Sequence, residues 1–370
     1  MYDIVIVGAG PAGSNLARLL NEKYRVLLVD RRKFDFSGVT KCCGGLLAPD
    51  AQKIIAELGL GIPKEVLVDP QLFAVRTIDL NAGYERLYQR YYYNMNREKF
   101  DQWLLSLVPK QVELAKDTLY KTHKKKDGLV EVTLVSQGEV RTVKTKVLIG
   151  ADGAHSKVRE NSEGITTSMN DYIAIQAHFP NPSAVPYYTA IFDFEITDFY
   201  AWMIPKDDKL LLGAALKPKD DPHSKFKHLI SKLETFGVLE GLGKPLLTEG
   251  AFINRPQHTR DLLLGSNKVA YVGEAAGAIS PSSAEGISYA LKSSLKLAKC
   301  LNASLTDYAG AYYYEMAHIR RNLMIKRMKS PVMYHPILRK TVMKLGIMSI
   351  KPKYDLNASL PYSQKTASLI

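Results

Sequence analysis

Three glycine-rich segments, far apart in the chain, carry the residue types that could hold a dinucleotide cofactor. The first extends from Tyr2 to Gly13, and Asp30 follows 17 residues after its end. Gly8 would permit a tight turn, Gly10 would let the backbone approach a pyrophosphate, and Gly13 would let a helix pack against a strand. The Asp30 carboxylate could accept hydrogen bonds from ribose hydroxyls, and it disfavours a 2′-phosphate. This segment alone predicts the adenosine part of FAD or NAD.

The second segment, residues 150–159, and the third, residues 272–287, supply further glycines and acids. Their candidate cofactor residues are Asp152, Gly153, Gly273, Glu274, Gly286 and Ile287. The order of the three segments predicts one bound FAD. A glycine-rich turn without a ligand is the alternative for the first segment, and an ordinary helix entry is the alternative for the third.

Predicted elements would place the first segment at the end of a parallel strand. Ile4 to Val7 is a short apolar run that suits a strand buried on both faces. A helix over residues 12–22 would direct its N-terminal N–H groups and positive dipole end toward the phosphates. A second strand over residues 25–29 would carry Asp30 at its tip. A further helix is expected from Asn96, as its N-cap, to Val108.

The rest of the chain is rich in predicted strands, which interrupt the nucleotide-binding part. Strands are expected within 71–93, 118–149, 171–215 and 269–273, and helices over 223–236 and 283–301. The predicted fold class is α/β: an FAD-binding Rossmann-like domain interleaved with a β-sheet substrate domain, plus C-terminal helices. The expected divisions are 1–70, 94–165 and 266–305 for the FAD-binding domain, 71–93 and 166–265 for the substrate domain, 306–360 for a basic helical region and 361–370 for a tail.

The composition of the chain favours a large core in a reducing compartment. Of its 370 residues, 46% are hydrophobic, and three are cysteines, too few for a disulfide framework. Neither a secretory signal nor an apolar run near the length of a membrane span is visible. We therefore expect a cytoplasmic protein, and no metal-binding motif is apparent.

The positive charge is concentrated between Met316 and Tyr354, a segment without Asp or Glu in a chain of formal net charge +13. Basic and apolar residues interleave there and predict basic amphipathic helices. A solvated outer face is one interpretation; attraction to an anionic membrane surface or a phosphorylated lipid, with a peripheral location at the membrane, is the other. Nucleic acid is not an expected partner. The basic residues are Arg320, Arg321, Lys326, Arg327, Lys329, Arg339, Lys340, Lys344, Lys351 and Lys353.

The stretch from Cys43 to Gln52, together with the three flavin segments, resembles flavoprotein monooxygenases of the p-hydroxybenzoate hydroxylase fold. Within them the chain is most similar to the geranylgeranyl reductase family, over nearly its whole length. The resemblance implies that Asp152-Gly153 lies near the FAD pyrophosphate. It also implies that Arg97 contacts the phosphate or ribityl region, with a surface ion pair as the alternative.

In the family's third segment an Asp that binds a ribityl hydroxyl normally follows the glycine, so Glu274 is one methylene longer than the pattern. Gly286 and Ile287 would present backbone N–H groups to the N1–C2=O edge of the flavin. Gly44 and Gly45 would allow the backbone to approach the flavin ring closely, and the neighbouring Lys41 could favour a thiolate at Cys43.

Cys43 is the catalytic candidate that the resemblance implies, by substrate positioning, proton delivery or tuning of the flavin. A small buried hydrophobe is the alternative, and it is the expected role of Cys42. The stretch from Tyr200 to Lys206 is similar to the family's Tyr-x-Trp-x-x-Pro-Lys. Tyr200, Trp202 and Pro205 would line an extended apolar pocket, although an ordinary core strand alternates in the same way. The residues expected at the cofactor are Gly8, Gly10, Ala12, Gly13, Asp30, Arg31, Gly44, Gly45, Arg97, Asp152, Gly153, Gly273, Glu274, Gly286 and Ile287.

The leading expectation is an FAD-dependent reductase that transfers hydride to a carbon–carbon double bond of an isoprenoid-like or other apolar substrate. One dinucleotide fingerprint is visible, so the reductant, NAD(P)H or a small redox protein, would dock transiently. A monooxygenase or halogenase on the same fold is the first alternative, because the flavin segments do not separate these outcomes. A non-catalytic lipid carrier is the second, and retention of Gly8, Gly10, Gly13 and Asp30 argues against it.

Overall fold

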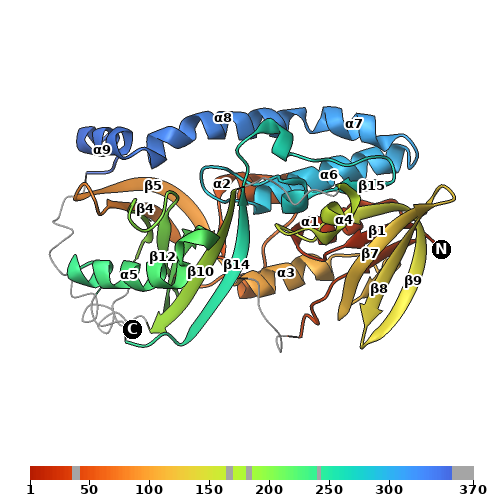
Figure 1. Cartoon of the computed structure of the whole chain (residues 1–370), viewed down its shortest axis with the longest axis horizontal. Helices are drawn as coiled ribbons and strands as arrows, with labels where there is room; N and C mark the ends of the chain where they lie inside the picture. The colour runs from red at the N-terminus through yellow and green to blue at the C-terminus, as the bar shows by residue number, and fades with distance from the viewer. Residues whose placement is uncertain (36–41, 164–169, 181–185, 240–242, 352–370) are drawn as a thin grey trace.

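The computed structural model of the chain describes residues 1–35, 42–163, 170–180, 186–239 and 243–351. Two β-sheets lie side by side, and the C-terminal helices run along one side of both (Figure 1). The first sheet has the order β6-β2-β1-β9-β8-β7, with β15 also paired to β9. Its strands are β1 (Tyr2–Val7), β2 (Val26–Val29), β6 (Glu113–Ala115), β7 (Thr118–Lys126), β8 (Leu129–Ser136), β9 (Glu139–Gly150) and β15 (Val269–Tyr271).

The parallel part of this sheet forms around β1, whose residues Ile4, Val5 and Ile6 are fully buried, as the continuous apolar run predicts. β1 pairs in parallel with β2 on one side and β9 on the other. Helices α1 (Pro11–Leu19) and α6 (Ile287–Ala303) pack together over the same core. Because these strands run in parallel, their carboxyl ends lie at the same edge of the sheet; they are β1, β2, β9 and β15.

The second sheet has the order β14-β10-β13-β12-β11-β4-β5-β3. One close fit in it joins Gly213 to Trp202: a Cβ on Gly213 would lie 2.4 Å from the indole ring, so glycine makes room for that side chain. The strands are β3 (Leu46–Leu47), β4 (Leu72–Asp79), β5 (Tyr84–Asn94), β10 (Asn170–Pro180), β11 (Tyr188–Phe192), β12 (Ala201–Lys206), β13 (Lys209–Leu216) and β14 (Leu247–Arg255). β3 thus joins this sheet although it precedes residue 70.

The other helices are α2 (Pro49–Glu57), α3 (Arg97–Ser106), α4 (Lys157–Glu163), α5 (Pro222–Thr235), α7 (Tyr308–Glu315), α8 (Ala317–Tyr334) and α9 (Pro336–Leu345). Asn96 caps α3, because its side chain accepts the N–H groups of Glu98 and Lys99, both at 3.0 Å. This confirms the predicted start of that helix. In the described part of the chain, no helix combines the length and apolar character that a membrane crossing requires.

The α/β fold with two sheets and C-terminal helices confirms the predicted class, whereas some boundaries differ. The helix expected to end at residue 22 ends at Leu19. The helix expected from residue 283 begins at Ile287, because Ala284 has a φ of +50°, outside the helical region. Strands β3, β6 and β14 and helix α4 had not been predicted.

Candidate flavin site

The first two glycine-rich segments touch at Gly8. This residue has a φ of +104°, and a Cβ on it would lie 2.4 Å from the carbonyl oxygen of Ala151 and 3.0 Å from the Cα of Asp152. A Cβ on Gly13 would lie 1.8 Å from the carbonyl oxygen of Gly8. Both positions therefore require glycine, because a side chain would separate β1 from either α1 or the end of β9.

The third segment packs against the same turn. Gly273 has a φ of +59°, and a Cβ on it would lie 3.0 Å from the Cβ of Ala12. Its N–H donates to the hydroxyl of Ser293 at 2.9 Å, which ties the segment to α6. The structure therefore brings the three glycine-rich segments together at the start of α1.

Gly10 lies beside this junction and faces open space. The nearest heavy atom that a Cβ on Gly10 would meet, among the described residues, is Nη2 of Arg32 at 3.9 Å. Gly10 is also the N-cap residue of α1, and no side chain described here caps that helix. An uncapped helix start next to an open glycine fits a bound pyrophosphate, because free N–H groups and the helix dipole both favour an anion.

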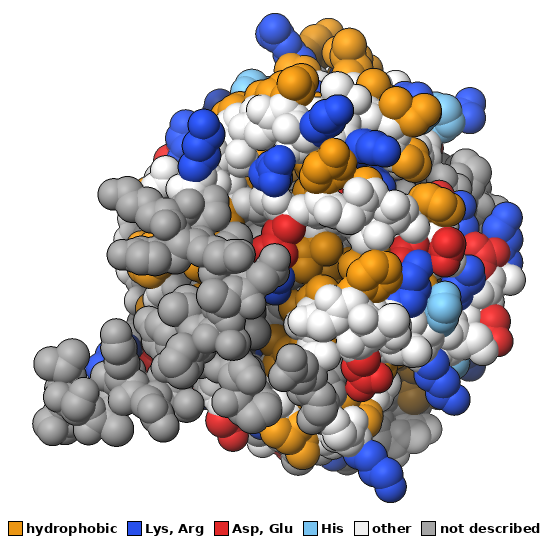
Figure 2. Space-filling model, turned by 90° about the vertical axis from the view of Figure 1, so that its left-hand side faces the viewer, with side chains coloured by type: hydrophobic (Ala, Val, Ile, Leu, Met, Phe, Trp, Pro, Cys, Tyr) orange, Lys and Arg blue, Asp and Glu red, His pale blue; other side chains and the backbone are white. Residues whose placement is uncertain are grey.

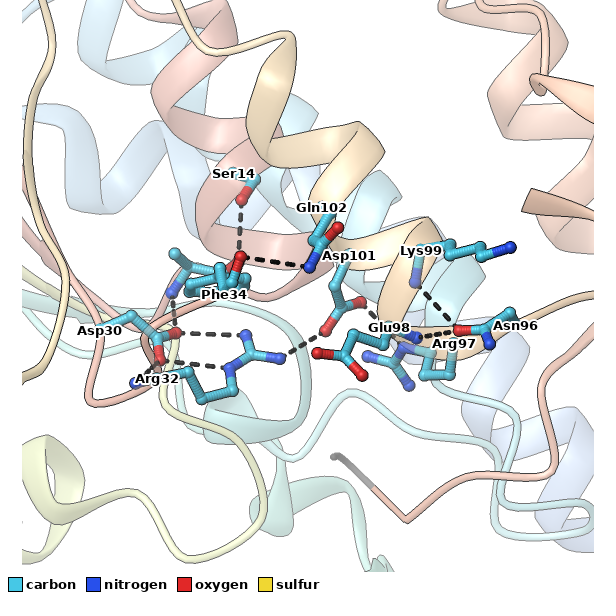
Figure 3. Close-up of polar contacts among 11 residues, drawn as sticks. Ser14, Asp30, Arg32, Phe34, Asn96, Arg97, Glu98, Lys99, Asp101 and Gln102 are labelled. Atoms are coloured by element: carbon cyan, nitrogen blue, oxygen red, sulfur yellow. Dashed lines mark hydrogen bonds and ion pairs between the residues drawn. The ribbon is translucent and has the colours of Figure 1, made fainter. Parts of the chain in front are cut away.

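Asp30 lies at the end of β2 and is held by the turn itself. Its carboxylate accepts the N–H of Ala9 at 2.7 Å and the backbone N–H of Arg32 at 2.8 Å (Figure 3). The guanidinium of Arg32 also bonds Asp30 and reaches Asp101 at 2.8 Å. Arg31, which the sequence analysis assigned to the cofactor, is exposed, so Arg32 is the arginine that enters this network.

Asp101 joins Arg32 to Arg97, whose Nε lies 2.8 Å from the other carboxylate oxygen (Figure 3). Burial acts to raise the pKa of Asp101, but the two guanidinium groups outweigh it and hold that pKa below its usual range. Burial likewise acts to lower the pKa of Arg97, and Asp101 followed by Cys43 raises it overall. Arg97 thus pairs with Asp101 as the alternative interpretation expected, but in a buried network rather than at the surface.

Asp152 and Arg159 organise the second segment. Burial raises the pKa of Asp152, although its carboxylate accepts bonds from the Ser156 hydroxyl at 2.5 Å and the Val158 N–H at 3.2 Å. Arg159 donates to the carbonyl oxygen of Ala275 at 2.7 Å and thereby links the second segment to the third. Asp152 therefore shapes the turn, and a Cβ on Gly153 would meet no described atom within 4 Å.

Glu274 and the start of α6 complete the third segment. One carboxylate oxygen of Glu274 accepts the backbone N–H of Asn254 at 3.2 Å, so this side chain also holds β14 against the segment. Gly286 is the N-cap residue of α6 and Ile287 its first residue. The carboxylate of Glu285 accepts the N–H of Ser288 at 2.7 Å. The first N–H groups of α6 therefore lie at the end of the same segment.

The loop of Cys43 connects this network to the second sheet. Its thiol is half-buried and accepts the N–H of Gly45 at 3.5 Å. Nζ of Lys206, at the end of β12, donates to the carbonyl oxygens of Gly45 at 2.9 Å and Met95 at 2.8 Å. A Cβ on Gly45 would lie 2.4 Å from the Met95 oxygen, so glycine is needed there. Lys41, assigned a role above, lies outside the described residues.

Lys206 is the last residue of the Tyr-x-Trp-x-x-Pro-Lys stretch, and no role had been predicted for it. Its burial lowers the pKa of the amine to about 7, against the influence of Cys43 and Asp207. Arg97 and Lys206 thus place two basic groups at the Cys43 loop. Nothing in the sequence reports burial of a lysine at the end of a strand; only the tertiary fold brings it to this loop.

Aromatic side chains from several elements gather beside the Cys43 loop. Tyr200 donates its hydroxyl to the carbonyl oxygen of Ser283 at 2.8 Å, and its ring centre lies 5.5 Å from that of Trp202. Trp202 and Pro205 are buried in the sheet, as the core-strand interpretation expected, whereas Tyr200 is half-buried. Burial raises the pKa of Tyr200, so its phenol stays neutral. The surrounding rings are Tyr92, Tyr188, Phe192, Phe199 and Tyr334.

Known proteins resemble this chain in sequence and in fold. Residues 1–184 match the model of an FAD binding domain. Protein CbrA of Escherichia coli O9:H4 (strain HS) is 39% identical over 355 residues, which is 96% of both chains, and Protein CbrA of Shigella sonnei (strain Ss046) is 38% identical over 96% of this chain and 99% of its own.

Among solved structures, a geranylgeranyl bacteriochlorophyll reductase-like protein from Thermoplasma acidophilum matches with a TM-score of 0.78 at 21% identity, covering 93% of this chain and 90% of its own. The flavin-dependent halogenase CmlS matches with a TM-score of 0.68 at 18% identity, covering 88% and 62%. PqsL, a probable FAD-dependent monooxygenase from Pseudomonas aeruginosa, matches with a TM-score of 0.67 at 17% identity, covering 94% and 99%.

The match of residues 1–184 to an FAD binding domain and the convergent glycine-rich segments define a protein with an FAD-binding fold. The chain belongs to the CbrA family. The open backbone at Gly10 and the uncapped start of α1 fit the pyrophosphate of FAD, and Gly286 and Ile287 begin α6 at the end of the third segment.

Gly10→Ala should weaken FAD binding by about tenfold, equivalent to about 1.4 kcal/mol, because the added methyl group would occupy the approach of the pyrophosphate. Its stability without FAD should be unchanged, because the site is open and its φ of −76° suits alanine. Fluorescence titration of the apoprotein with FAD measures the affinity. Gly61→Ala, at another open glycine, is the control. Equal affinity in both variants would contradict a pyrophosphate at Gly10.

Lys206→Met should change how stability depends on pH. Between pH 7 and the ordinary lysine value of 10.5, the folded protein binds fewer protons at Lys206 than the unfolded chain does. The free energy of unfolding of the wild type should therefore rise with pH relative to the variant, by up to about 1.4 kcal/mol per unit. Urea unfolding at pH 6, 7, 8 and 9 measures this difference. The exposed Lys209→Met is the control, and a pH-independent difference for Lys206→Met would refute the shifted titration.

Proposed function

We propose that this protein reduces a carbon–carbon double bond of an isoprenoid-like or other apolar substrate, with FAD as its cofactor. The observation that carries the proposal is the juxtaposition of the Cys43 loop with a cluster of neutral aromatic side chains. Lys206 holds the loop at the carbonyl oxygen of Gly45, and the neighbouring Cys42 packs in the same cluster as Tyr200 and Trp202. A cluster of aromatic side chains with few polar groups suits contact with an extended hydrocarbon.

The chain's own residues would orient the substrate and supply a proton. When bound, reduced FAD would supply the hydride for one carbon of the double bond. The second carbon then needs one proton, which the Cys43 thiol would donate. Lys206 would act as a positioning residue, because it holds the carbonyl oxygens of Gly45 and Met95 on either side of the loop.

The fold likeness to the geranylgeranyl reductase-like protein supports reduction. Oxygenation or halogenation is the second candidate, because the fold is also that of a halogenase and of a probable monooxygenase. We propose NAD(P)H or a small redox protein as the transient reductant.

Anaerobic reduction of the purified holoenzyme, followed by addition of polyprenyl compounds, tests the reaction class. We expect products that gain two hydrogens per reduced double bond without oxygen, together with reoxidation of the flavin absorbance. Mass spectrometry of parallel reactions with and without air measures the outcome. Products that gain oxygen, formed only in air, would replace the reductase proposal with the oxygenase.

Cys43→Ser should leave FAD bound and slow anaerobic single-turnover reduction by about 10²-fold, the lower end of the range for general acid catalysis. Stopped-flow absorbance of the flavin measures the rate. Cys42→Ser is the matched control, because this neighbouring thiol is buried and accepts the amide N–H of Gln176 at 3.1 Å instead. If both variants slow turnover equally, or neither does, Cys43 has no specific catalytic role.

A further inference from the structure

Helices α8 and α9 contact the rest of the molecule through a narrow stripe. The buried residues of α8 are Ile319, Leu323 and Ser330, and those of α9 are Arg339 and Met343. Their spacing of four or seven residues marks one side of each helix. Most of the remaining surface of both helices is exposed; we call it the C-terminal face.

Large apolar side chains lie exposed on the C-terminal face and in the turn that follows it. Met328 is 73% exposed, Ile337 69%, Leu345 68% and Met348 84%. Others at least 39% exposed are Met324, Ile325, Val332, Met333, Leu338, Ile347 and Ile350. Single exposed apolar residues are ordinary, but a cluster of this extent indicates an interaction site.

The basic residues of the C-terminal face divide into two groups. Arg339 is buried, with its Nε 2.7 Å from Asp79, and Lys326 lies 3.1 Å from Asp50, so both serve the fold. Lys353 lies outside the described residues. The exposed ones are Arg321, Arg327, Lys329, Lys340, Lys344 and Lys351. No Asp or Glu occurs between residues 316 and 351, so this charge is not neutralised within the segment.

The two kinds of side chain are interleaved rather than separated. In Figure 2, which views the molecule from the end where α9 lies, blue basic and orange apolar side chains lie side by side along the upper part of the surface. A second copy of the chain would bring like charges together. Nucleic acid would use the charge but leave the aliphatic side chains in water.

We propose that the C-terminal face docks on an anionic lipid bilayer. Its Met, Ile and Leu side chains would enter the boundary between head groups and acyl chains, while the exposed lysines and arginines contact the head groups. Tyr334, at the end of α8, packs on the inner side with its ring centre 5.2 Å from that of Phe199. If the proposed reaction is correct, docking also brings the aromatic cluster near lipid; docking itself does not depend on that reaction.

Sedimentation of the holoenzyme with vesicles tests the proposal without any turnover. Vesicles of phosphatidylglycerol and phosphatidylcholine should bind the protein at low salt, and pure phosphatidylcholine should bind it far less. Lys329→Glu/Lys340→Glu should weaken binding at least 20-fold, since each basic residue near such a surface contributes about fivefold. The control is Lys124→Glu/Lys126→Glu, which makes the same charge change on the β7–β8 hairpin at the other end of the molecule.

A second pair of variants tests the apolar contribution. Met328→Ser/Ile337→Ser should weaken vesicle binding about tenfold or more, and Leu119→Ser/Val140→Ser, at exposed positions of the first sheet, should not. No sedimentation with anionic vesicles at low salt would overturn the proposal, as would equal loss in target and control variants. Conversion of a dimer to a monomer by Met328→Ser/Ile337→Ser would also overturn it, because the face would then be a contact between copies.

Discussion

The close approach of three backbone segments at the start of α1 is the constraint on which the flavin site depends. Gly8 and Gly13 leave no space for a side chain, and Gly273 meets Ala12 at the same point. These contacts set the ends of β1, β9 and β15 around one helix start. Gly10 differs from the other glycines because the space above it is open. Packing thus explains Gly8 and Gly13, whereas it does not explain Gly10.

A second set of contacts couples the cofactor region to the second sheet. Asp101 joins the guanidinium groups of Arg32 and Arg97, and so connects the turn at Asp30 to the start of α3. Lys206 then ties α3's entry and the Cys43 loop to the end of β12 through two carbonyl oxygens. A displacement of either sheet would have to break buried charged hydrogen bonds, which are costly to leave unmade. The reacting atoms would therefore be held by both sheets together.

Local patterns in the sequence predicted the parts of the site that depend on local geometry. The apolar run at Ile4, the glycine spacing and the cap at Asn96 each follow from neighbouring residues, and each gave the observed element. Burial that depends on residues far apart in the sequence leaves no such local pattern. Arg32 rather than Arg31 enters the network because of how β2 ends, and Lys206 reaches the Cys43 loop only through pairing of the second sheet. The same holds for Arg339: the sequence places it among surface charges, but in the fold it is buried and pairs with Asp79.

Helix α8 lies between the aromatic cluster and the C-terminal face, because its two sides have different surroundings. On the inner side, Tyr334 packs among the aromatic rings and donates its hydroxyl to the carbonyl oxygen of Ser282 at 2.7 Å. On the outer side, Arg327 and Met328 are exposed. One helix therefore separates the aromatic cluster from the C-terminal face. An apolar substrate dissolves in lipid far better than in water, so an aromatic cluster that lies behind a lipid-facing helix would shorten the passage through water that such a substrate must make.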